Sequence, residues 1–162
     1  MSMAVVEFKK LNRQMLLYRV VQTVLVALLV FMALNYQNLF AQRGKPEQFV
    51  SSLVFAIIIQ LLLLYPVYKL AWRDVGIEIE GLAAGLTTEK LAPLRKKRLI
   101  SDLWKFCSVA FFIIFVALIP DAKTKPAATF FLATTIFSFL LTCLMYFQCF
   151  NFSAKKQIKE LK

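Results

Sequence analysis

Four long apolar runs constrain this chain more than any other feature of its sequence. They cover residues 15–34, 49–70, 103–119 and 127–150. Each run is roughly 20 residues long, and a helix of that length crosses the hydrocarbon core of a bilayer, about 30 Å thick. Hydrophobic residues make up 60% of the chain, well above the share in a soluble domain. The sequence therefore predicts an all-α integral membrane protein with four transmembrane helices.

The connections between the runs predict how the helices are joined. Residues 35–48 form a short polar connection in which Gly44 and Pro46 mark a turn, and residues 120–126 form a second short connection. Short connections favour antiparallel neighbours, so we expect two antiparallel hairpins. The first run is too long for a signal peptide and no small-residue cleavage site follows it, so we interpret it as a retained span. Spans and connections use nearly all of the 162 residues, which predicts a single domain over residues 1–162.

The longest connection, residues 73–101, is expected to be a basic loop between the two hairpins. In its first part, residues 75–80, Val75, Ile77 and Ile79 alternate with small or acidic residues, a period of two that predicts a short extended segment. Pro93 is expected at the first position of a helical turn leading into the third span. The run Arg95-Lys96-Lys97-Arg98 would then spread around that turn.

The distribution of Lys and Arg predicts the orientation in the membrane. Sixteen of the 20 Lys and Arg residues lie in the two terminal flanks and in the central loop with its flanks. Under the positive-inside rule, both termini and the central loop are cytoplasmic. Most Tyr and Trp residues lie near the same ends of the runs, as interfacial aromatic anchors do. We expect a multi-pass protein of a bacterial inner membrane.

The net charge of +11 has a membrane interpretation. The cations cluster beside the apolar runs, and no base-reading or stacking motif accompanies them, so we expect no nucleic-acid partner. The run Arg95, Lys96, Lys97 and Arg98 is typical of a topological signal. The same run could instead contact anionic lipid headgroups of the bilayer or dock an acidic partner protein.

Reactive chemistry is scarce in this sequence. Histidine is absent, which removes the commonest metal ligand and the usual general base. No ionisable residue lies at the centre of a run, and Cys107, Cys143 and Cys149 form no Cys-x-x-Cys pair. The patterns of small multidrug exporters, lipoprotein signal peptidases and glutathione-using membrane enzymes are not present. We therefore expect no catalytic residue, no cofactor, no metal site and no enzymatic activity.

Polar residues inside the runs are interpreted as contacts between helices, because small and polar side chains replace the hydrophobic drive in lipid. Small residues recur on one face of the fourth run, and Ser52, Ala56 and Gln60 form a similar row on the second. A hydrogen bond between Gln22 and Gln60 is predicted, although either residue could instead line a path for a solute. The expected interhelical polar contacts are Gln22, Gln60, Thr135, Ser138 and Thr142.

Three classes of function follow from these observations. The first is a non-enzymatic protein that binds another membrane protein or itself, as an accessory subunit of a larger complex or as a blocker of the immunity or exclusion kind. The second is an oligomeric transporter or channel with Gln22 and Gln60 facing a pore. The third is a lipid-modifying enzyme at the cytoplasmic interface, for which the nearby carboxylates are Asp74, Glu78, Glu80 and Asp102. The scarcity of reactive groups favours the first class.

Overall fold

The structure is a computed structural model that describes residues 8–82, 88–118 and 125–160. Its elements are the helices α1 (Lys9–Gln42), α2 (Pro46–Glu80), α3 (Thr88–Leu118) and α4 (Pro126–Glu160). All four are long and apolar enough to cross a membrane. The prediction of an all-helical chain with four apolar helices is thereby confirmed, and each helix extends beyond its apolar run.

The first connection is shorter than predicted. Helix α1 continues through the polar residues after position 34 and ends at Gln42, and α2 begins at Pro46. Only a tight turn remains, in which Gly44 has a φ angle of +65°, a left-handed conformation that glycine adopts without steric cost. Tyr36 and Phe40, on the added turns of α1, are buried against the other helices, and this packing outweighs the weak helix propensity of the polar residues beside them.

The prediction of an extended segment at residues 75–80, inside a loop over residues 73–101, was wrong. Helix α2 runs to Glu80 and α3 begins at Thr88. Ala71, Asp74 and Val75 are all buried, and their spacing of three and four residues places them on one face of a helix. That face packs against Phe150 and Ala154 of α4. The local sequence fits both the two-residue period of a strand and the period of a helix, and tertiary packing selects the helix.

Pro93 also lies in a different position from the one predicted. It stands in the second turn of α3, inside the helix, and not at its first residue. A proline so near the start of a helix removes a single backbone hydrogen bond. The basic run Arg95 to Arg98 is accordingly helical, and its side chains spread around α3 as expected.

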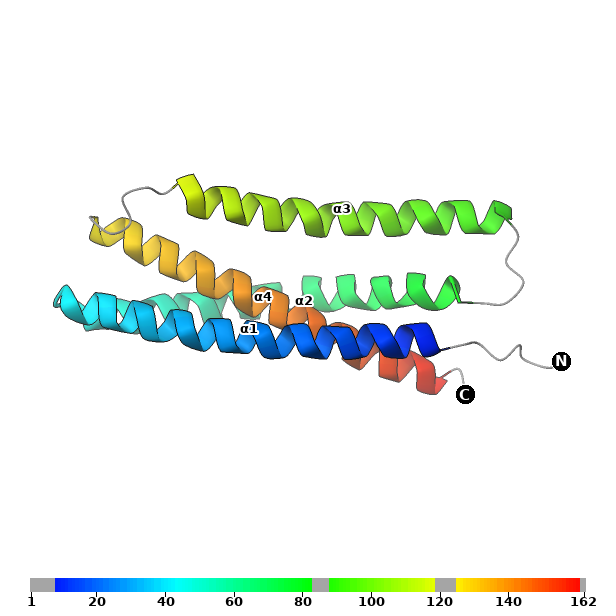
Figure 1. Cartoon of the computed structure of the whole chain (residues 1–162), viewed down its shortest axis with the longest axis horizontal. Helices are drawn as coiled ribbons and strands as arrows, with labels where there is room; N and C mark the ends of the chain where they lie inside the picture. The colour runs from blue at the N-terminus through cyan, green and yellow to red at the C-terminus, as the bar shows by residue number, and fades with distance from the viewer. Residues whose placement is uncertain (1–7, 83–87, 119–124, 161–162) are drawn as a thin grey trace.

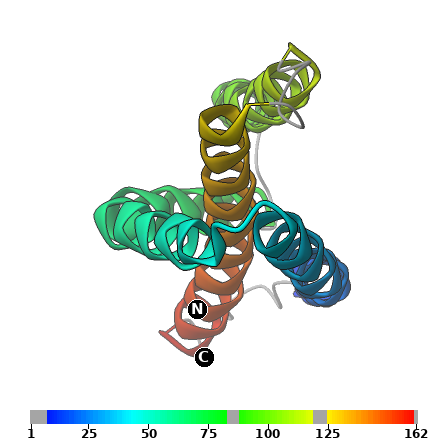
Figure 2. The ribbon, with the colours of Figure 1, turned by 90° about the vertical axis from the view of Figure 1, so that its left-hand side faces the viewer.

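The four helices lie lengthwise beside one another (Figure 1), and the beginning of α1 and the end of α4 lie at the same end of the molecule. Seen from one end (Figure 2), α4 crosses obliquely between α1 and α2. Helix α4 makes its most extensive contact with α2 and a smaller one with α1, whereas α3 makes little contact with any other helix. The fold is a three-helix core of α1, α2 and α4 with α3 standing at its side.

Two apolar clusters hold the core together. One is centred on Phe137 of α4, which packs with Tyr36, Phe40 and Ala56. The other, near the opposite end, joins Leu11, Val75 and Phe150. Where α2 and α4 cross, fully buried small residues let the backbones approach closely, as is usual between helices in lipid: Ser52, Ala56, Ala71, Ala133, Ser153 and Ala154.

Candidate functional site: the Asp74 cluster and two adjoining cavities

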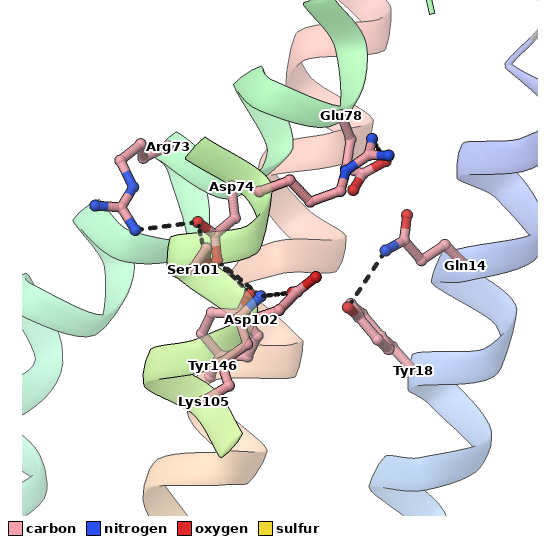
Figure 3. A network of polar contacts seen from close by, with 10 residues as sticks. Gln14, Tyr18, Arg73, Asp74, Glu78, Ser101, Asp102, Lys105 and Tyr146 are labelled. Carbon is pink, nitrogen blue, oxygen red and sulfur yellow. Dashed lines mark hydrogen bonds and ion pairs between the residues drawn. The ribbon is translucent and has the colours of Figure 1, made fainter. Parts of the chain in front are cut away.

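The carboxylate of Asp74 is the centre of a polar cluster that ties three helices together (Figure 3). Asp74 lies on α2 and is only 5% exposed. It accepts hydrogen bonds from the Ser101 hydroxyl of α3 at 2.9 Å and from the Tyr146 hydroxyl of α4 at 2.7 Å. The Lys105 ammonium of α3 lies 3.0 Å from its second oxygen, and Arg73 lies 3.4 Å from the first. Both carboxylate oxygens are thus satisfied, as a buried charge requires.

Further ion pairs surround this cluster. The guanidinium of Arg98 on α3 forms a 2.6 Å ion pair with Glu78 on α2. Lys105 also lies 3.7 Å from Asp102, one turn earlier on its own helix, and 5.1 Å from the ring centre of Tyr146. Because α3 makes little other contact with the core, these charged contacts are its main attachment at this end of the molecule.

The groups of the cluster are engaged with one another in hydrogen bonds and ion pairs. Ser101 is 4% exposed, and its hydroxyl proton is directed at Asp74. Lys105 and Tyr146 are held by the same carboxylate. No group of three or more His, Cys, Asp and Glu residues that could hold a metal ion occurs in the described parts of the chain.

The sequence interpretation named Asp74 only as one of four carboxylates and missed its partners. Ser101, Lys105 and Tyr146 are distant from it along the chain, and a sequence alone does not show that they meet. One signal was available, because Ser101 and Lys105 are four residues apart and lie on one face of α3. Of the other carboxylates, Glu78 and Asp102 lie beside the cluster.

A cavity of about 750 Å³ with charged and apolar lining residues lies between this cluster and α1. We call it the α1/α3 cavity. Figure 3 shows Gln14 and Tyr18 of α1 facing the cluster across it. Its lining comes from all four helices: Lys10, Arg13, Gln14, Leu16, Leu17, Tyr18, Val20, Asp74, Ile77, Glu78, Arg98, Ser101, Asp102, Lys105 and Phe150.

A second, apolar depression of about 610 Å³ lies between α3 and α4. We call it the α3/α4 groove. Its lining is rich in aromatic and small residues: Ile59, Trp104, Cys107, Ser108, Phe111, Phe112, Phe115, Thr134, Thr135, Ser138, Phe139 and Thr142. The rings of Phe112 and Phe139 stack at 3.9 Å across it. The hydroxyls of Thr134 and Ser138 are buried and have no hydrogen-bond partner among the described residues.

The predicted hydrogen bond between Gln22 and Gln60 is not made, because each glutamine bonds to α4, which lies between their helices. The Gln22 amide donates to Gln148 at 3.0 Å. The Gln60 amide donates to the Thr142 hydroxyl at 2.7 Å and to the Ser138 carbonyl at 2.9 Å. The crossing of α4 between α1 and α2 explains the difference.

The other predicted contact residues have different surroundings. The Thr135 hydroxyl bonds to the Phe131 carbonyl of its own helix, and its side chain lines the α3/α4 groove. In the basic run, Arg95, Lys96 and Lys97 are exposed and Arg98 is paired with Glu78. Cys107 is exposed, and Cys143 and Cys149 are partly buried free thiols.

The hydrogen bond between Gln60 and Thr142 should be measurable as a coupling between α2 and α4. A double-mutant cycle of Gln60→Leu and Thr142→Val is expected to give a coupling of about 0.6–1.7 kcal/mol, the range for hydrogen bonds between helices in membranes. The readout is the free energy of unfolding in mixed micelles. Gln22→Leu combined with Thr142→Val is the control, because Gln22 bonds elsewhere and should show no coupling.

Four apolar helices, of which three form a packed core, indicate a multi-pass membrane protein. A scan against protein-family models and searches of curated proteins and of solved structures each gave no match.

Proposed function

We propose that this chain is a non-enzymatic, multi-pass inner-membrane protein that acts by binding another membrane protein. It would serve as an accessory subunit of a larger membrane complex or as a blocker of the immunity or exclusion kind. In this proposal the helices form two antiparallel hairpins with both termini on the cytoplasmic side. The exposed cations Arg95, Lys96 and Lys97 would rest on anionic headgroups of that leaflet.

The α3/α4 groove is the observation that carries the proposal. Helix α3 is held to the core by the Asp74 cluster at one end. Further along it touches α4 through the stacked rings of Phe112 and Phe139, but other aromatic side chains beside the groove stay exposed. Trp104, Phe106 and Phe111 are among the most exposed side chains of α3. Aromatic residues supply much of the contact area in interfaces between proteins, and an open groove between two helices can take the side chains of a third.

The unpartnered hydroxyls favour a protein over lipid as the occupant of the groove. Thr134 and Ser138 each hold a hydroxyl oxygen that is buried and without a partner among the described residues. An acyl chain offers only methylene groups and would leave these hydroxyls unsatisfied, at a cost in free energy. A transmembrane helix with a polar side chain at this depth would satisfy them. These hydroxyls favour a transmembrane helix as the occupant, and in this proposal the helix belongs to a different protein.

The two other classes of function have less support. Gln22 and Gln60, the residues expected to face a pore, are engaged in hydrogen bonds with α4. Of the four carboxylates considered for an enzyme, Asp74 is buried and hydrogen-bonded. These contacts favour structural roles for the three residues.

Photo-crosslinking in living cells tests the proposal. A photoreactive residue at Phe111, in the α3/α4 groove, is expected to give one reproducible adduct with a second membrane protein. The same residue at Val24, an exposed position of α1 that does not line the groove, should give none. Mass spectrometry then identifies the adduct, and the two proteins are purified together to test direct binding.

A matched pair of substitutions makes the test specific. Ser138→Leu fills the groove and removes one unpartnered hydroxyl, so it should abolish both the adduct and co-purification. Thr23→Leu makes a similar change on the exposed face of α1, where the hydroxyl bonds its own helix, and should have no effect. An adduct with a second copy of this chain would contradict the proposal and move the interpretation to the oligomeric transporter. Adducts with lipid alone would also contradict it.

A further inference from the structure

The α1/α3 cavity combines both signs of charge with an apolar wall. Four cations line it, together with three carboxylates. Its volume of about 750 Å³ is in the range of small-molecule binding sites. It is separate from the α3/α4 groove, and no contact proposed above makes use of it.

The charges that remain available in this cavity are of both signs and come from different helices. Arg98 and Lys105 are paired with Glu78 and Asp74. On the α1 side, Lys10 and Arg13 form no ion pair with any described residue. Asp102 on α3 is 65% exposed and has one long contact, 3.7 Å to Lys105. A ligand in the cavity would meet two unpaired cations on one wall and an accessible carboxylate on the other.

The cavity walls also carry unsatisfied hydrogen-bonding atoms of both kinds. The Oε1 atom of Gln14 is an acceptor and the Nε of Arg98 is a donor, and neither has a partner among the described residues. Figure 3 shows Gln14 extending from α1 toward the cluster on α2 and α3. A ligand that supplies acceptor oxygens and a donor N–H would satisfy both sides.

An apolar strip leads away from the charged part of the cavity along α1. Leu16, Leu17 and Val20 line the cavity and are largely exposed. They belong to the apolar run at residues 15–34, which is expected to lie in the hydrocarbon layer. The strip is therefore placed to contact an acyl chain whose polar end lies beside Lys10 and Arg13.

We propose that the α1/α3 cavity binds a zwitterionic aminophospholipid, with its phosphate at Lys10 and Arg13 and its ammonium at Asp102. The acyl chain lies along Leu16, Leu17 and Val20. The phosphate accepts charge-assisted hydrogen bonds from the two cations, and the ammonium donates to the carboxylate. This site goes beyond the proposed function and does not depend on it, because binding is measured on the purified chain without a partner protein.

The balance of charges distinguishes this lipid from the anionic lipids expected at the basic run. The polar end of an anionic headgroup carries no positive charge that could pair with the Asp102 carboxylate. An ammonium group carries one and is complementary to that carboxylate. A free phosphate ester would leave the apolar strip of α1 unused. The arrangement of cations, carboxylate and apolar strip matches a lipid molecule from headgroup to chain.

Native mass spectrometry of the full chain in detergent tests the site. The probes are dioctanoyl phosphatidylethanolamine and dioctanoyl phosphatidylglycerol, with glycerophosphoethanolamine and inorganic phosphate as soluble competitors. We expect the ethanolamine lipid to bind at lower concentration than the glycerol lipid. Lys10→Gln with Arg13→Gln should weaken its binding roughly tenfold to thirtyfold, since each surface cation contributes about 1 kcal/mol.

Two further variants make the result decisive. Lys96→Gln with Lys97→Gln removes the same charge from exposed positions of α3 that do not line the cavity, and should change binding by less than about twofold. Asp102→Asn should retain lipid binding but abolish the preference for ethanolamine over glycerol. Equal binding of the two lipids by the unmodified chain would overturn the proposal, as would equal losses in both double variants. Displacement of the lipid by equimolar glycerophosphoethanolamine would overturn the assignment to a lipid.

Discussion

Asp74→Ala is expected to lower the free energy of unfolding by about 3 kcal/mol, because it removes the acceptor shared by three helices. The substitution leaves the buried Ser101 hydroxyl and the Tyr146 hydroxyl without their acceptor. It also removes the close carboxylate partner of the Lys105 ammonium, which keeps the longer contact to Asp102 and the ring of Tyr146. Reversible unfolding in mixed micelles, driven by sodium dodecyl sulfate and followed by tryptophan fluorescence, measures the change.

The matched control is Asp102→Ala. Its carboxylate contacts the same Lys105 but is mostly exposed, and exposed ion pairs contribute between about 0.2 and 1 kcal/mol. Asp74→Asn adds a second comparison, since its amide oxygen can still accept one hydrogen bond and should recover part of the loss. Equal effects of the two alanine substitutions would contradict the central position given to Asp74.

Phe137→Ala is expected to be the most disruptive substitution in the apolar core. Phe137 is 0% exposed, and its ring lies edge-on to Tyr36 at 5.7 Å and to Phe49 at 6.2 Å. Lipid is as apolar as this core, so the hydrophobic effect contributes little to the loss of stability. The loss comes from the cavity that the missing ring leaves behind. A residual cavity of roughly 100 Å³ corresponds to about 2.4 kcal/mol of lost stability.

Phe131→Ala on the same helix is the control for this prediction. Its side chain is 63% exposed and is expected to face lipid, so its removal should change the free energy of unfolding by less than about 0.5 kcal/mol. The same unfolding titration measures both variants. A loss for Phe131→Ala as large as that for Phe137→Ala would mean that the outer face of α4 is also packed against protein.

The sequence was a good guide to which segments are helical, and a poor one to where the helices end. The runs at 15–34 and 49–70 were apparent from their apolar length, because the bilayer imposes that length on a helix. Gln42 and Glu80, where α1 and α2 end, were not apparent. Helix continues there because Phe40 and Val75 are buried against other helices, and no local pattern shows such contacts.

The sequence likewise predicted only part of the candidate site. The scarcity of reactive residues and the clustering of cations beside the apolar runs are properties of composition, and they were visible at once. The partners of Asp74 were not, since Ser101, Lys105 and Tyr146 stand on two other helices. The sequence singled out Gln22 and Gln60 as polar residues in apolar runs, but their partners depend on α4 lying between α1 and α2.

The sequence by itself determined the membrane class, the four apolar helices and the scarcity of reactive side chains at the helix centres. These follow from segment length and from the cost of burying charge in hydrocarbon. Only the tertiary structure decided that α3 stands beside a three-helix core, that Asp74 joins them, and that a charged cavity and an apolar groove lie on its two sides. The reason is that lipid solvates the apolar faces of all four helices equally well. Which helices pack together therefore depends on small residues and on single hydrogen bonds between positions distant in the sequence.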